Sequence, residues 1–189
     1  MKTGLVETAG FKVISEICRI KPKMSRKMTD LSAKSVPTGS KEGMYYEIFP
    51  SPRLVKFMET EYAIPLHQFE ACIEEIHDFL RAHPFFVHFP IECRVTTGED
   101  AFLSPTQGRA TAFLAFHMYK GMDEGHYFKW VHKLMETYEG RPHYGKMNDL
   151  TIEKMHKLYP NIDRFMAIRE QCDPKDVFLT NYLKSIFSV

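Results

Sequence analysis

Glu92 and Arg94 are the first residues whose types and spacing could do chemistry. They lie two positions apart in FFVHFPIECRVTTG, residues 85–98, where apolar and polar residues alternate as in a strand. Residues two apart on a strand point to the same face, so the carboxylate and the guanidinium would lie side by side. Such a pair can hold a polyhydroxyl ligand, because the carboxylate accepts hydrogen bonds from hydroxyls and the guanidinium donates to oxygens. The same pattern also fits a surface ion pair, which contributes only ~0–1 kcal/mol.

The segment GRPHYGK, residues 140–146, gathers a second group of candidates. Its Gly and Pro residues interrupt a helix and predict a shaped loop that presents His143, Tyr144 and Lys146. The ammonium group of Lys146 could stabilise negative charge that develops on a substrate oxygen. The other interpretation is a helix-capping loop with exposed basic residues, and the pattern leaves both open.

His117 is the third candidate. It lies in the apolar run ATAFLAFHMY, residues 110–119, which predicts a strand on which His117 shares a face with Phe113 and Ala115. A lone histidine in such a strand is often a core residue that bonds to the backbone. The alternative is an imidazole that faces a ligand, where it could donate or accept a proton near neutral pH.

Composition and motifs exclude several classes of protein. The 189 residues are 44% hydrophobic and 26% charged, which is the balance of a globular domain. The sequence contains no nucleophile elbow, P-loop, dinucleotide-binding GxGxxG, EF-hand or HExxH motif. Its four cysteines lack the spacing of a zinc site. We therefore expect neither a metal site nor a nucleic-acid partner.

The spacing of the cysteines and the hydropathy of the sequence indicate in which compartment of the cell the chain is found. The absence of a CxxC pair indicates a reducing compartment without disulfides. The first residues do not resemble a signal peptide, and no apolar run approaches the ~18 residues of a membrane span. We therefore expect a cytoplasmic protein. Residues 1–43 carry a net charge of +5 and residues 44–189 one of −4, so the basic N-terminal arm either touches an anionic membrane surface or is a solvated helical segment.

The order of the predicted elements indicates an α+β fold. Residues 1–43 would form an arm with a helix over 5–20 and then a loop with at most a short helix. Beyond it, strands are predicted at 44–49, 54–62, 85–98 and 110–119, with a turn at 50–52, and helices at 65–83, 123–139, 151–159, 161–171 and 178–187. We expect residues 44–189 to form one domain, in which helices cover a mostly antiparallel sheet and the C-terminal tail is helical.

An ordered string of motifs gives the chain a family resemblance. The motifs are YAIP at 62–65, HFPIECR at 88–94, LSP at 103–105, FHMY at 116–119, GRPHYGK at 140–146, LYP at 158–160 and IREQCDPKDVFLTNYL at 168–183. In this order and spacing they resemble the C-terminal region of the aldonolactone oxidoreductases, which include L-gulonolactone oxidase, D-arabinono-1,4-lactone oxidase and, as close relatives, alditol oxidases. The resemblance covers residues 44–189.

The resemblance implies a fold and a chemistry. Members of the family resemble vanillyl-alcohol oxidase, in which an FAD-binding domain is joined to a substrate domain whose sheet covers the isoalloxazine ring. A substrate C–H gives a hydride to flavin N5 while the adjacent hydroxyl loses a proton. By this resemblance the chain would be the substrate-binding part of an FAD-dependent oxidase of a sugar 1,4-lactone, or of an alditol such as xylitol.

The resemblance also implies roles for the candidate residues. Glu92 would hold substrate hydroxyls, and Arg94 would hold the reacting oxygen and support the anionic reduced flavin. Lys146, with His143 in the same loop, would lie near the reacting hydroxyl and the flavin edge. His117 would face the substrate.

Asn181 would lie near the flavin by the same resemblance. Tyr144 stands where many members have Trp, and an aromatic body with a polar tip preserves the packing.

Nothing in the sequence matches the family's FAD-binding half, so a flavin-binding domain would have to act in cis or in trans, and the 189-residue chain alone is expected to be inactive. The alternative from another class is a stand-alone, non-catalytic binding module that kept the fold.

Overall fold

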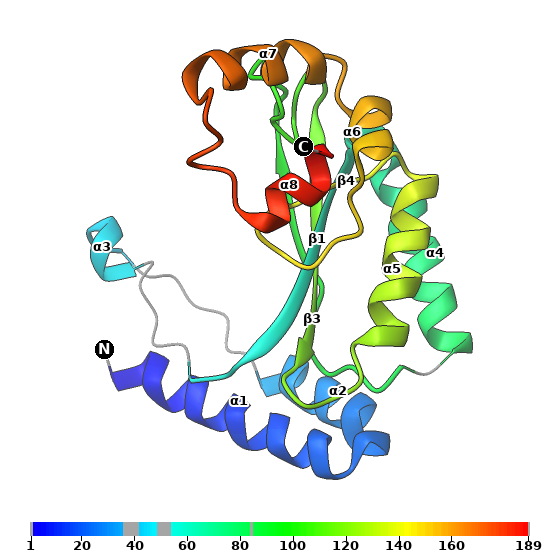
Figure 1. The fold of residues 1–189 in the computed structure, drawn as a ribbon. Coiled ribbons are helices and arrows are strands. Elements are labelled where there is room, and N and C mark those ends of the chain that lie inside the picture. Colours follow the sequence, from blue (N-terminus) through cyan, green and yellow to red (C-terminus); the bar gives the residue numbers. More distant parts are fainter. Residues whose placement is uncertain (1, 36–41, 49–53, 84, 189) are drawn as a thin grey trace.

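An antiparallel sheet lies at the centre of the computed structural model, which describes residues 2–35, 42–48, 54–83 and 85–188 (Figure 1). Within these residues the sheet has four strands in the order β2-β3-β1-β4. They are β1 (Phe57–Pro65), β2 (Glu92–Thr96), β3 (Thr111–Tyr119) and β4 (Arg141–Pro142). Each pairing is antiparallel, and the combination with helices confirms the expected α+β class.

Two helices cover one face of the sheet (Figure 1). They are α4 (Phe69–Ala82), which follows the short helix η2 (Leu66–Gln68), and α5 (Gly125–Thr137). Apolar residues recur three and four positions apart in both, so each helix has one apolar stripe to bury. The rings of Phe79 and Trp130 stack at 4.5 Å where the two helices meet. The core that forms against the sheet includes Tyr62, Ile64, Cys72, Ile76, Leu114, Phe116, Tyr127, Val131 and Met135.

The N-terminal helices pack against one end of the sheet (Figure 1). They are α1 (Lys2–Ile20), η1 (Pro22–Met24) and α2 (Ser25–Ser35). Ser15 Oγ lies 2.9 Å from Nε2 of the buried His88, and the Tyr119 hydroxyl at the end of β3 donates to Glu16 Oε1 at 2.5 Å. The predicted helix over 5–20 is confirmed, whereas the segment expected to be mostly loop contains the three-turn helix α2.

The C-terminal tail is helical, as predicted. It contains α6 (Ile152–Leu158), α7 (Ile162–Cys172) and α8 (Asn181–Phe187). Thr151 and Thr180 cap α6 and α8, because their side chains accept the backbone N–H groups of Lys154 and Leu183. These helices enclose a second, smaller core made of Leu150, Met155, Tyr159, Ile162, Ile186 and Phe187.

One strand prediction was wrong, and the strand predicted over 85–98 is shorter than expected. Residues 45–48 form the short helix α3 (Tyr45–Ile48) and not part of a strand over 44–49. Strand β2 begins only at Glu92, because Pro90 has no N–H for the ladder and the buried His88 bonds to Ser15 of α1. The turn expected at 50–52 lies outside the described residues.

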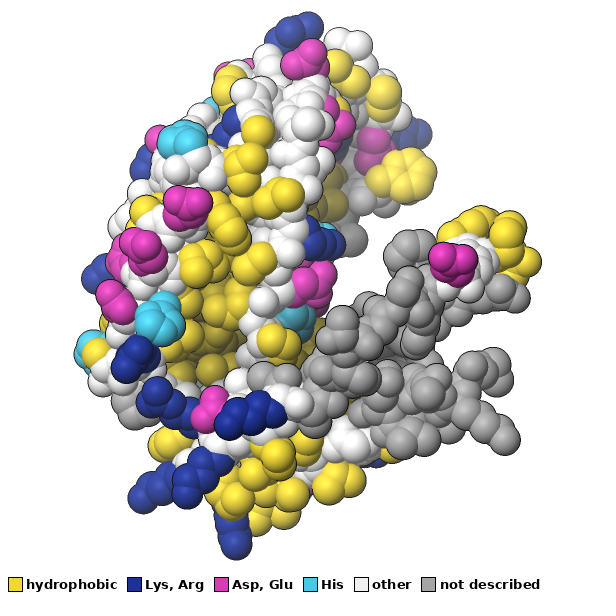
Figure 2. Space-filling model, turned by 180° about the vertical axis from the view of Figure 1, so that it is seen from behind, with side chains coloured by type: hydrophobic (Ala, Val, Ile, Leu, Met, Phe, Trp, Pro, Cys, Tyr) yellow, Lys and Arg dark blue, Asp and Glu magenta, His cyan; other side chains and the backbone are white. Residues whose placement is uncertain are grey.

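The segment before β2 borders a hollow on the back of the molecule (Figure 2). The hollow has a volume of about 490 Å³ and lies where α2 and α4 meet residues 85–91. Its lining is mainly hydrophobic, with Lys23, Arg26 and Arg81 among its polar members. Residues 85–91 therefore serve the packing of the N-terminal helices and do not extend the sheet. No helix in the described ranges is long and apolar enough to cross a bilayer.

Candidate active site

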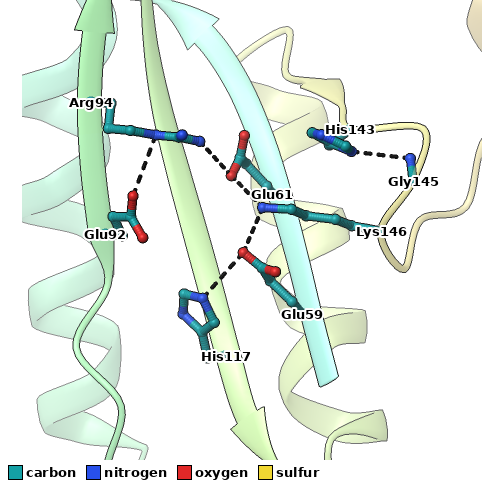
Figure 3. A network of polar contacts seen from close by, with 8 residues as sticks. All are labelled: Glu59, Glu61, Glu92, Arg94, His117, His143, Gly145 and Lys146. Atoms are coloured by element: carbon teal, nitrogen blue, oxygen red, sulfur yellow. Dashed lines mark hydrogen bonds and ion pairs between the residues drawn. The ribbon is translucent and has the colours of Figure 1, made fainter. Parts of the chain in front are cut away.

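The face of the sheet that α4 and α5 leave open carries polar and charged side chains from three strands and one loop (Figure 3). Glu59 and Glu61 come from β1, and His117 of β3 is the register partner of Glu59. Glu92 and Arg94 come from β2, on the other side of β3. Alternate residues of a strand point to one face, so the antiparallel register brings these five side chains together. With Lys146 from the loop after β4, we call them the charged row.

The charged row is held by contacts in which carboxylates and nitrogens alternate (Figure 3). Arg94 Nη2 donates to Glu61 Oε2 at 2.7 Å, and Lys146 Nζ donates to the same oxygen at 2.6 Å. Lys146 Nζ also donates to Glu59 Oε1 at 2.5 Å, and that oxygen lies 3.1 Å from His117 Nε2. The row therefore links β1, β2, β3 and the lysine loop through side chains alone.

The exposed fraction of the side chains increases along the charged row, from Glu61 to Glu92. The Glu61 side chain is 2% exposed and that of Lys146 is 20% exposed, whereas Arg94 and Glu92 are 52% and 57% exposed. Arg94 Nε lies 3.5 Å from Glu92 Oε1, which is a long contact at the solvent-facing end. A ligand on this face would meet Arg94, Glu92 and Lys146 first, with Glu61 beneath them.

The loop after β4 places Lys146 by main-chain hydrogen bonds to β1. The N–H of His143 donates to the carbonyl of Glu61 at 2.9 Å, and the N–H of Met147 donates to the carbonyl of Glu59 at 2.9 Å. Between these two bonds the chain turns, and the N–H of Lys146 donates to the His143 carbonyl at 3.2 Å. Lys146 is therefore fixed at both ends of the turn, and its ammonium group reaches back over β1.

Three other predicted site residues lie outside the charged row. The His143 ring is exposed, and its Nδ1 accepts the N–H of Gly145 at 3.0 Å (Figure 3). Tyr144 turns toward the C-terminal helices, where its hydroxyl donates to the Leu103 carbonyl at 3.1 Å. Asn181 is an exposed first residue of α8. The structure therefore gives His143 a role in shaping the loop and brings only Lys146 of that loop to the charged row.

His117 is half-enclosed by aromatic rings. The ring centroids of Phe57 and Phe89 lie 5.0 and 5.7 Å from that of the imidazole. Burial lowers the pKa of His117, nearby Lys146 lowers it too, and Glu59 opposes the shift. The buried Nδ1 makes no hydrogen bond to any described group. A neutral imidazole that donates from Nε2 to Glu59 would thus keep a bare acceptor at Nδ1.

Reasoning from the sequence missed Glu59 and Glu61. Both lie in FMETEYAIP, where glutamates alternate with Met58, Thr60 and Tyr62, and this alternation shows that the two carboxylates share a face. What the alternation does not reveal is the pairing of β1 with β3, which brings the glutamates next to His117 and Arg94. Their placement depends on long-range register.

The charged row suits a neutral ligand with several hydroxyl groups. Three carboxylates stand against the cations Arg94 and Lys146, so the row offers acceptors and charged donors in alternation without an excess of positive charge. A polyol or a sugar ring presents hydroxyls that need both kinds of partner. In the described part of the chain, no group of three or more His, Cys, Asp or Glu side chains is placed to hold a metal ion.

The α+β class of the fold is the one expected from the family resemblance. The family model described as D-arabinono-1,4-lactone oxidase matches residues 1–186. The chain therefore belongs to this family. The match covers the N-terminal helices and residues 44–186, and so almost all of the segment that carries the motif resemblance.

Comparison with individual proteins gives the same assignment. The L-gulono-1,4-lactone dehydrogenase of Mycobacterium tuberculosis (strain ATCC 25618 / H37Rv) is 34% identical over 95% of this chain and 42% of its own length. The L-gulonolactone oxidase of Mus musculus is 35% identical over 67% of this chain and 30% of its own length. The alditol oxidase of Streptomyces sp. is 23% identical over 68% of this chain and 31% of its own length. The chain thus spans less than half the length of the curated relatives it matches.

Proposed function

We propose that the chain is the substrate-binding part of an FAD-dependent oxidoreductase that acts on the CH–OH group of a sugar 1,4-lactone. The observation that carries the proposal is the pair of cations, Arg94 and Lys146, that share one oxygen of Glu61 on an open sheet face. Membership of the lactone oxidase family supports it.

Two residues at the solvent side of the charged row would bind the sugar. Glu92 is exposed and acceptor-only when ionised, so it would accept hydrogen bonds from lactone hydroxyls. Arg94 uses Nη2 for Glu61 and is half exposed, which leaves N–H donors of its planar fork for ring and carbonyl oxygens.

Lys146 would act at the reacting hydroxyl. Its ammonium group has three N–H donors, and two of them are taken by Glu59 and Glu61. The remaining donor is available to one oxygen of the substrate. A fixed positive charge at this point would stabilise the oxygen as it loses its proton, which is a role for preorganised charge in catalysis.

The residues fit a flavin in their donor set. The cations of Arg94 and Lys146 are close together on the open face and would support an anionic ring, and the buried Nδ1 of His117 has no partner among the described groups. When bound, the flavin supplies the acceptor for the hydride. Most of the FAD would be held by a flavin-binding domain, in the same polypeptide or as a separate one. Asn181 and His143 would contribute at the margin of this site.

A chimera tests the proposal. The chain replaces the matching region of the M. tuberculosis L-gulono-1,4-lactone dehydrogenase, whose remaining part supplies the residues this chain does not cover. After loading with FAD, anaerobic addition of sugar 1,4-lactones and, separately, of alditols is followed by bleaching of the flavin absorbance. We expect bleaching with a lactone, and none for the 189-residue chain with FAD alone.

The outcomes separate the competing functions. Bleaching by alditols and not by lactones would move the assignment to an alditol oxidase. A chimera that folds and binds FAD but reacts with neither class would favour a non-catalytic binding module. Activity of the isolated chain with FAD would overturn the need for a second domain.

A further inference from the structure

We infer that Glu61 is a positioning residue that sets the spacing between Arg94 and Lys146 and aims both cations at the ligand. The inference deepens the proposed function and rests on it. Glu61 lies outside the sequence motifs that carry the family resemblance, and its role follows from its contacts.

The two cations share one oxygen of Glu61. Arg94 Nη2 and Lys146 Nζ donate to the same atom, Glu61 Oε2, at 2.7 and 2.6 Å. The two nitrogens are therefore no further apart than the sum of these distances. Two positive charges this close repel each other, and the carboxylate between them makes the arrangement favourable. Without that charge, Glu59 alone would hold Lys146, and nothing would offset the repulsion that drives its ammonium group away from the guanidinium.

Glu61 is buried more deeply than the two cations that it holds. Glu61 is 2% exposed, whereas Lys146 and Arg94 are 20% and 52% exposed. The carboxylate lies under the cations, on the inner strand β1, and a ligand that reaches the cations does not need to touch it. Glu61 thus acts through Arg94 and Lys146, which is why we describe it as positioning and not as catalytic.

Glu61 differs from the neighbouring carboxylate, Glu59, in the partners that it holds. Glu59 also bonds to Lys146, but among the described residues its other side-chain partner is His117, and it forms no hydrogen bond or ion pair with Arg94. Glu61 bonds to the cation of β2 and to the cation of the lysine loop, and its carbonyl also accepts the N–H of His143. Of the described residues, it is the one whose side chain joins both cations.

The test begins with the 189-residue chain and needs no oxidase activity. An amine-selective acylating reagent is added, and mass spectrometry gives the labelling rate of each lysine. In the unmodified chain the Lys146 amine is held by two carboxylates, and in Glu61→Gln it loses one charge-assisted partner, so we expect its labelling to be about tenfold faster. Exposed Lys133 is the internal reference, since an unchanged rate there shows that the fold has not opened.

Two further variants make this test decisive. Glu75→Gln removes an exposed carboxylate of α4 that bonds to Tyr138, and it should leave the Lys146 rate unchanged. Glu61→Asp keeps the charge but shortens its reach, and it should give an intermediate rate even if Glu61→Gln does not fold. A wild-type Lys146 rate in a folded Glu61→Gln or Glu61→Asp variant would overturn the inference.

The flavin-loaded chimera supplies the kinetic readout. Misplaced cations would weaken the interactions that stabilise negative charge on the substrate oxygen in the transition state. Glu61→Gln should therefore lower kcat by about 10- to 100-fold, with a smaller change in KM. Glu61→Asp should recover part of the loss. A rise in KM with kcat intact would contradict a positioning role. If the parent chimera has no turnover, the proposed function fails while the labelling result for Glu61 still stands by itself.

Discussion

Glu59 and His117 face each other across the antiparallel pair of β1 and β3, with Glu59 Oε1 3.1 Å from His117 Nε2. The same carboxylate oxygen holds the ammonium group of Lys146. The imidazole therefore lies at one end of the charged row, where the charges of its neighbours shift its pKa. Its protonation state reports on whether the row is assembled, which makes it the most direct probe of the site.

The first prediction concerns the pKa of His117. Burial and Lys146 hold this pKa below its usual 6.5, and Glu59 raises it. Glu59→Gln should therefore move the pKa further down, because the neighbouring negative charge is lost. Lys146→Gln should move it up, because a neighbouring positive charge is lost. Imidazole chemical shifts measured against pH by NMR on the 189-residue chain check both directions, and shifts of the same sign in the two variants would contradict the structure.

The second prediction concerns stability at low pH. His88 is buried, and burial lowers its pKa to about 4. Between about pH 4 and 6.5 the unfolded chain binds a proton at His88 that the folded chain does not bind. The contribution of neutral His88 to the free energy of unfolding is therefore fully present above pH 6.5 and is lost as the pH falls. From pH 7.5 to 5 this histidine should cost about 2 kcal/mol of the free energy of unfolding.

Urea unfolding at the two pH values measures that loss. His88→Gln can keep a hydrogen bond to Ser15 and removes the titration, so most of the difference between the two pH values should disappear. Exposed His67 is the matched control, and His67→Gln should retain the full difference. An undiminished pH effect in His88→Gln would locate the sensitivity elsewhere.

Much of this arrangement follows from the sequence, and the remainder depends on tertiary contacts. The α+β class, helices α4 and α5 and strand β3 follow from the periodicity of apolar residues, which is a local property. The face shared by Glu92 and Arg94 follows from their spacing for the same reason. The short apolar run at 44–49 has no periodicity long enough to separate helix from strand, and it contains the short helix α3.

The membership of the charged row illustrates what sequence spacing leaves out. His143 and Lys146 lie three residues apart in one loop, and no periodicity says which of them points to the sheet. The hydrogen bonds of the loop to β1 decide it, since they turn the ammonium group toward Glu59 and Glu61. Those bonds require the register of β4 on β1, which is set by the whole fold.

The third prediction uses a pair of glycines. A Cβ at Gly140 would lie 2.9 Å from the Met135 carbonyl oxygen and 3.0 Å from a ring carbon of Tyr62. Gly140→Ala should therefore lower the free energy of unfolding by about 1–3 kcal/mol through overpacking. Gly10 lies within α1 and a Cβ there meets nothing within 4 Å, so Gly10→Ala should raise stability by about 0.5–1 kcal/mol. Urea unfolding of both variants checks the opposite signs.

The fourth prediction concerns the support of the lysine loop. On the helix-covered face, the Tyr62 hydroxyl lies 2.7 Å from His132 Nδ1 and donates to Asp149 Oδ1 at 3.3 Å. Tyr62→Phe removes both contacts in a buried place and should destabilise the chain by about 1–3 kcal/mol. Tyr138 donates to the exposed carboxylate of Glu75, so Tyr138→Phe should cost less. Equal losses in the two variants would show that the buried contacts add nothing.

The fifth prediction separates geometry from charge at Arg94. Arg94→Lys keeps the positive charge but loses the planar fork that reaches Glu61 through Nη2 and lies near Glu92 through Nε. The single nitrogen of a lysine cannot occupy the Nε and Nη2 positions together, so the contacts that fix the cation would be lost in part, and flavin reduction in the chimera should slow by about 10²–10³-fold, the usual cost of one lost charge-stabilising donor. Arg81, which lines the hollow on the far side, provides the matched control, and Arg81→Lys should reduce the flavin at the parent rate. Rapid-mixing measurements of flavin bleaching give both rates, and an Arg94→Lys rate equal to that of Arg81→Lys would show that positive charge alone is sufficient at this position.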